Sequence, residues 1–142
     1  MKITLSILFL IFNGFFWMKN SNDHPQKFDQ EKDKLAKSAQ AGKEIYQDFC
    51  IRCHLADGKG SKTVPPLDKS DWLIQKRKES IHAVKFGQSG EIVVNGNTYK
   101  NSMPPMGLTD EEVADVMNYI MNSWSNKQSK MVTVAEVESI KK

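Results

Sequence analysis

Cys50, Cys53 and His54 form the part of this sequence that is best equipped to do chemistry. Two thiols three positions apart, followed directly by a histidine, match the attachment motif of c-type haem. At this spacing both sulfurs can reach the two vinyl groups of one porphyrin and form thioethers, and the adjacent imidazole is then delivered to the iron from the same side. The motif therefore predicts one covalent haem on Cys50 and Cys53, with His54 as an axial ligand of the iron.

Three other readings of the two cysteines explain less of the sequence. A thioredoxin-like dithiol needs a βαβ framework around the pair, and no strands of that length are apparent. A zinc site needs a second pair of ligands at a suitable spacing, whereas His24 and His82 are isolated in the sequence. A disulfide would strain the three-residue step and leave His54 without a role. We therefore predict haem c as the cofactor.

The second axial ligand is expected among the seven methionines of the chain. Met117 and Met121 recur at a helical spacing that favours packing in the core. Met103 and Met106 instead lie in a proline-containing loop, where Pro104 biases Met103 away from helical geometry. We predict Met103 as the sixth ligand, with Met106 as the alternative. Ligation by histidine and methionine fills both axial positions and raises the reduction potential.

The first 20 residues have the pattern of an export signal. Lys2 precedes an apolar run of about sixteen residues, as in a secretory signal peptide. The run is shorter than the roughly 20 residues that span a bilayer comfortably. However, large side chains at residues 15–18 occupy the place where small ones would mark a cleavage site. Residues 1–20 are therefore predicted to be a signal peptide or an uncleaved anchor that attaches the chain to the inner membrane through residues 3–18, and the domain is expected in the periplasm.

The remainder has the composition of one small globular domain. The chain has 142 residues, of which 39% are hydrophobic and 26% charged. Two of the 20 basic residues, Lys2 and Lys19, belong to residues 1–20, so the rest of the chain has 18 basic and 17 acidic residues and is almost neutral. Such a balance argues against nucleic-acid binding through phosphate neutralisation. Residues 21–37 and 127–142 are mostly polar, and we expect a linker and a C-terminal tail there.

Two helices are predicted at the ends of the domain. In the first, apolar residues recur at steps of three and four, namely Leu35, Ala39, Gly42, Ile45, Tyr46 and Phe49. The second begins at Thr109, a natural N-cap that forms a capping box with Glu112. Its apolar face comprises Val113, Val116, Met117, Ile120, Met121 and Trp124.

The segment between these helices is rich in glycine and proline. Residues 80–86 are compatible with a short helix. Residues 92–94 and 98–99 flank Asn95 and Gly96, which favour the turn of a very short hairpin.

Together these motifs resemble the class I monohaem cytochrome c family. The sequence resembles in particular small bacterial periplasmic cytochromes and the cytochrome modules fused to copper nitrite reductases. The resemblance covers residues 38–126 and rests on residues 42–46, 50–54, 58–67, 95–105 and 119–124. It implies an all-α cytochrome c domain in which three to four helices pack around one haem.

The resemblance also implies roles for several residues near the haem. The carbonyl of Pro66 would accept a hydrogen bond from the histidine ring and orient it. Gly42 would allow the first and last helices to approach closely. Trp72 and Tyr99 are candidates to bind a haem propionate, although half-buried surface aromatics are an equally good reading of both.

The function implied by the resemblance is that of an electron carrier rather than an enzyme. Such a carrier shuttles single electrons between redox protein partners, such as a respiratory complex, an oxidase or a reductase. Two alternatives stay open. The chain could be a subunit or anchored module of one particular oxidoreductase complex, or a haem enzyme or gas sensor with an open sixth site.

Overall fold

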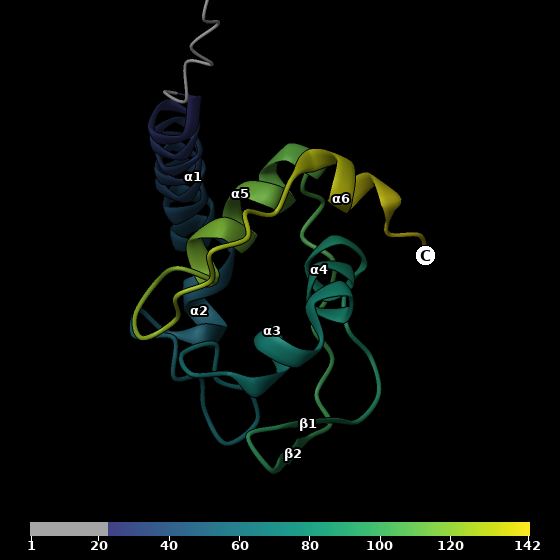
Figure 1. Ribbon diagram of the computed structural model, residues 1–142. Helices are drawn as coiled ribbons and strands as arrows, with labels where there is room; N and C mark the ends of the chain where they lie inside the picture. Colours follow the sequence, from purple (N-terminus) through teal and green to yellow (C-terminus); the bar gives the residue numbers. More distant parts are fainter. Residues whose placement is uncertain (1–22) are drawn as a thin grey trace, which may run out of the picture.

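The structure, a computed structural model, describes residues 23–142, so the predicted signal peptide or anchor in residues 1–20 lies outside the described residues. Helices dominate the described chain, which confirms the predicted all-α class. In chain order the elements are α1 (Asp23–Ile45), the π-helix η1 (Tyr46–Cys50), α2 (Ile51–His54), α3 (Asp71–Gln75), α4 (Arg77–Phe86), β1 (Ile92–Val94), β2 (Asn97–Tyr99), α5 (Asp110–Ile120) and α6 (Val134–Ser139) (Figure 1). Within residues 23–142 no helix is both long enough and apolar enough to cross a membrane.

α1 and α5 form the main helix pair of the domain. They cross at Gly42, where an added Cβ would overlap the backbone carbonyl of Asp115 in α5. Beside the crossing, Ser38 donates a hydrogen bond to the Asp115 carboxylate and accepts one of 2.8 Å from the Asn118 amide. The expected close approach of the two terminal helices at Gly42 is therefore present.

Replacement of Gly42 by alanine is expected to destabilise the haem-loaded protein by about 2 kcal/mol, since overpacking a well-filled contact costs about 1–3 kcal/mol. Helix propensity alone would act in the opposite direction, because alanine is better than glycine inside a helix by about 1 kcal/mol. Denaturant unfolding of the holo-protein measures the change, and Ala41→Ser at the exposed neighbouring position is the control. A gain in stability for Gly42→Ala would contradict the close contact.

α5 begins where the sequence predicts. The Thr109 hydroxyl accepts a hydrogen bond from the Glu112 N–H at 3.2 Å, and the Glu112 carboxylate accepts one from the Thr109 N–H at 2.8 Å. This capping box satisfies N–H groups that have no partner inside the helix. Met117 and Met121 are almost fully buried, as expected for core residues.

Trp124 lies beyond the end of α5 rather than on its apolar face. The helix ends at Ile120, and Trp124 has a left-handed φ of 54° in the turns that follow. Its indole N–H donates a hydrogen bond of 3.0 Å to the carbonyl of Ala56, and its ring lies against Gly58. Trp124 therefore covers the loop that follows His54.

The middle segment contains the predicted hairpin and more helix than expected. β1 and β2 pair antiparallel, with Ile92 opposite Tyr99. α4 begins at Arg77 rather than at residue 80, and α3 was not expected. Asp71 at the start of α3 exchanges two hydrogen bonds with Asn95 at the hairpin turn, of 2.8 and 2.9 Å, and so ties α3 to the hairpin.

The structure differs from the expected polar linker at residues 21–37, because α1 is already helical from Asp23. Residues 29–34 are all exposed, in keeping with their polarity. Glutamine, glutamate and lysine are nevertheless good helix formers. Once the C-terminal half of α1 is packed, the helix can extend outward without a new nucleation step.

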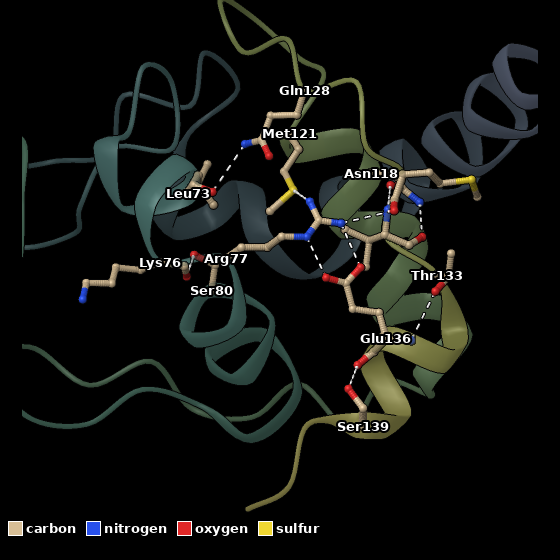
Figure 2. Close-up of polar contacts among 12 residues, drawn as sticks. Leu73, Lys76, Arg77, Ser80, Asn118, Met121, Gln128, Thr133, Glu136 and Ser139 are labelled. Atoms are coloured by element: carbon tan, nitrogen blue, oxygen red, sulfur yellow. Dashed lines mark hydrogen bonds and ion pairs between the residues drawn. The ribbon is translucent and has the colours of Figure 1, made fainter. Parts of the chain in front are cut away.

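The structure also differs from the expected polar tail at residues 127–142. Val132 and Val137 are fully buried, and α6 packs against α4 and α5. Figure 2 shows Arg77 of α4 paired with the Glu136 carboxylate, through Nε at 2.7 Å and Nη2 at 2.9 Å. The side-chain amide of Asn118 in α5 holds the backbone N–H and carbonyl of Val132 at 2.7 and 2.9 Å. Partners distant in sequence therefore make this segment part of the core.

Candidate haem site

One cavity gathers every site residue that the sequence predicts. Its wall is mainly apolar and is built from η1, α2, the loop that follows it, α3, α4, the hairpin, the loop before α5, and α5 itself. The predicted residues in the wall are Cys50, Cys53, His54, Pro66, Trp72, Tyr99, Met103 and Met106. Residues separated by up to 56 positions thus meet at one site, as a haem pocket requires.

The two cysteines differ in their surroundings. Cys50 closes the π-helix η1 and is buried, whereas Cys53 in α2 is exposed, and both are free thiols. Burial is the main cause that raises the pKa of the Cys50 thiol to about 11, and the charge of the nearby Cys53 adds to it.

Among residues 23–142 there is no group of three or more histidine, cysteine or acidic side chains arranged for a metal ion.

The π-helix explains why Phe49 does not follow the predicted apolar stripe. A π-helix is wider than an α-helix and often lies at a functional site. Here Cys50 is buried, whereas Phe49 is 46% exposed and contributes to the cavity wall. Tyr46 at the start of η1 is buried and donates a hydrogen bond of 2.7 Å to the carbonyl of Leu55, the residue after His54. This hydrogen bond links the residues that precede and follow the Cys50–His54 motif and so holds the motif in place.

His54 is oriented by the carbonyl of Pro65, not that of Pro66. The Nδ1–H of His54 donates to the Pro65 oxygen at 3.2 Å, which corrects the assignment made from the sequence. Neighbouring carbonyls along an extended chain point in different directions, so only one of two adjacent prolines can face the ring. Burial lowers the pKa of His54. This shift favours the neutral imidazole, and the hydrogen bond at Nδ1 leaves Nε2 for a metal.

Met103 is held in place by the chain that leaves α4. Gln88 and Met103 form an isolated β-bridge, with both backbone hydrogen bonds at 2.8 Å. Gly87 lies so close that an added Cβ would be 2.7 Å from the Met103 carbonyl oxygen. Met106 is half-buried in the same wall. Sequence reasoning missed Gly87 and Gln88, because nothing in their local pattern marks them as partners of a loop 15 residues away.

The chemistry of the cavity fits a covalent haem. Two thiols at the attachment spacing adjoin an imidazole whose Nδ1 is already hydrogen-bonded, and the thioethers of Met103, Met106 and Met117 lie in the same wall. The largely apolar lining suits the porphyrin face. Nitrogen and thioether sulfur are the axial donors that cytochromes c use.

Comparison with known proteins agrees with this geometry. Residues 39–124 match the family model described as "Cytochrome c". The chain is 32% identical over 136 residues to the gluconate 2-dehydrogenase cytochrome c subunit of Pantoea cypripedii, which covers 86% of this chain and 30% of that protein. It is 32% identical over 99 residues to the cbb3-type cytochrome c oxidase subunit CcoP of Rubrivivax gelatinosus, covering 66% of this chain and 29% of that protein.

A relative of similar size is also found. Cytochrome c-552 of Thermus thermophilus is 32% identical over 117 residues, which covers 75% of this chain and 78% of the relative. By contrast, the chain spans less than a third of the dehydrogenase and oxidase subunits named above. The family model matches a range that contains the CxxCH motif and all the residues of the pocket, and the chain therefore belongs to the class I monohaem cytochrome c family, with haem c as its cofactor.

Proposed function

We propose that this chain is a one-electron carrier whose haem iron is ligated by His54 and Met103. One observation carries the proposal: His54, oriented by Pro65, and Met103, fixed by Gln88, line the same cavity. Met106 lies in the same wall but has no such bridge in the described chain, which favours Met103 over the alternative. Haem c supplies a single iron that cycles between the ferric and ferrous states.

The residues of the pocket serve electron transfer in three ways. Cys50 and Cys53 would attach the cofactor, and His54 and Met103 would ligate its iron. With both ligands bound, no position on the iron would be free for a substrate or a gas. The apolar wall limits access of water to the haem, which influences its potential.

A visible absorption spectrum of the holo-protein tests this proposal. We expect low-spin ferric and ferrous spectra, a methionine–iron charge-transfer band in the ferric protein, and no change when carbon monoxide is added to the ferrous protein. A high-spin spectrum, or ready binding of carbon monoxide, would instead favour the haem enzyme or gas sensor.

A role as a subunit of a larger oxidoreductase is the second candidate. The names of several relatives support it, since these relatives are cytochrome c subunits of gluconate and alcohol dehydrogenases and of cbb3-type oxidases. The proposed partners are thus redox proteins. Co-purification from the native membrane after mild detergent extraction separates the two candidates, because a free carrier would be recovered alone.

We further propose that the domain works in the periplasm, either released or held at the inner membrane by residues 3–18. The export pattern of the first 20 residues supports this location. N-terminal sequencing of the mature protein distinguishes cleavage from retention.

A further inference from the structure

Lys85, near the end of α4, joins three segments through one ammonium group. Its Nζ lies 2.8 Å from Oδ1 of Asp110 at the start of α5 and donates a hydrogen bond of 3.0 Å to the carbonyl of Val137 in α6. Both partners of the ion pair are shielded, with 14% of the Lys85 side chain and 32% of the Asp110 side chain exposed. By contrast, the Lys59–Asp57 and Lys100–Glu91 pairs are more than half exposed. Shielding from solvent makes the Lys85 contact the more consequential one.

The ion pair fixes one end of the loop that carries Met103. We call residues 100–109 the methionine loop. Asp110 is the first residue after it, and Met103 within it is bridged to Gln88, only three residues after Lys85. Both attachments of the methionine loop therefore arise from residues 85–88, the end of α4 and the turn that follows.

The turn after α4 packs tightly against the methionine loop. Gly87 has a φ of 86°, and a Cβ there would be 2.7 Å from the Met103 carbonyl oxygen and 3.0 Å from the Pro105 ring. Because packed segments move together, a shift of the end of α4 would be passed directly to Met103.

We propose that Lys85 is a positioning residue for Met103. By holding Asp110 and α6 against the end of α4, it keeps the methionine loop closed and the thioether at the iron. This inference rests on the proposed function, in which Met103 is the sixth ligand. Lys85 does not touch the haem pocket itself, because it is not part of the cavity wall.

Arg77 provides the matched control, because it makes the other charged connection between α4 and α6. Its hydrogen bonds go to Glu136, to the Met131 carbonyl and to the Met121 sulfur, none of which belongs to the methionine loop. The Arg77–Glu136 pair is as shielded as that of Lys85, at 18% and 21% exposed. Loss of Arg77 thus weakens the docking of α6 and leaves the ends of the methionine loop attached.

The test compares full-length holo-proteins carrying Lys85→Met, Lys85→Arg and Arg77→Met. The readouts are the affinity of the ferric protein for imidazole, which competes with the methionine, the charge-transfer band, and the thermal midpoint. We expect Lys85→Met to bind imidazole about tenfold more tightly, equivalent to about 1.4 kcal/mol, and Lys85→Arg to restore most of the difference. Arg77→Met is expected to lower the midpoint but to leave imidazole affinity within about twofold of the parent.

Two results would overturn the inference. One is an unchanged imidazole affinity in Lys85→Met, and the other is an equal gain in Lys85→Met and Arg77→Met. If Lys85→Met yields no folded holo-protein, Asp110→Asn removes the same ion pair with little change in shape. It should then raise imidazole affinity several-fold, and no change in that variant would equally refute the role of Lys85.

Failure of this inference can be told apart from failure of the ligand assignment. Met103→Ala is measured in the same assay. If it leaves imidazole affinity unchanged, Met103 is not the ligand, and the role of Lys85 falls with it. If Met103→Ala raises the affinity and Lys85→Met does not, only the positioning role is wrong.

Discussion

Replacement of His54 by alanine is expected to abolish normal haem ligation and to lower the yield of folded holo-protein about tenfold or more, since even the loss of a residue that supports a metal ligand costs 10–100-fold. His54 is the one imidazole in the cavity wall of the described chain, and it is also tied to the Pro65 carbonyl. Its removal would thus take away the proposed iron ligand and one hydrogen bond that orders the loop at residues 58–67. Without the cofactor, the small domain would lack much of its apolar core.

The yield is measured as haem absorbance per mole of purified chain, together with the spin state of the ferric protein. His82→Ala is the matched control, because His82 lies in α4 outside the haem cavity and packs against Phe86. A His54→Ala protein with the parental low-spin spectrum would show that another group ligates the iron.

Replacement of Met103 by alanine is expected to open the sixth position. The ferrous protein should then bind carbon monoxide, the ferric charge-transfer band should disappear, and the potential should fall by on the order of 100 mV, a modest part of the roughly 0.8 V that axial ligands span. The fall follows because thioether ligation favours the ferrous state. The β-bridge to Gln88 is made by the backbone and can survive the substitution.

Met106→Ala is the control, since Met106 lies in the same cavity wall three residues away. It should keep the charge-transfer band and remain unresponsive to carbon monoxide. The reverse outcome, with the band lost only in Met106→Ala, would assign the ligand to Met106. For each variant, a redox titration with optical detection gives the reduction potential and the charge-transfer band from one sample.

Local chemistry accounts for the parts of the structure that sequence reasoning anticipates. The capping box of Thr109 and Glu112 acts within one helical turn, and the Asn95–Gly96 turn acts within one hairpin. The Cys50–His54 motif likewise holds its reactive groups within five residues. Such signals need no knowledge of distant partners, and the structure contains each of these elements where the sequence predicts it.

The features that sequence reasoning misses depend on distant partners. The C-terminal segment buries Val132, just before α6, and Val137 within α6, two apolar residues that form no visible helical stripe. Its position depends on Arg77 and Asn118 in other helices. The choice between the Pro65 and Pro66 carbonyls is a matter of chain direction in a loop. Neither propensity nor spacing contains that information.

The outer part of α1 has a consequence for how the domain can be spaced from its surroundings. Figure 1 shows α1 extending away from the rest of the domain. At 1.5 Å per residue, residues 23–34 extend the helix by about 18 Å. A flexible linker would sample both short and long separations, whereas a helical spacer excludes the short ones. The helix therefore keeps the domain at a distance from the start of α1 at Asp23. Fraying of its outer turns would let the domain come closer to that end and would raise its effective concentration there.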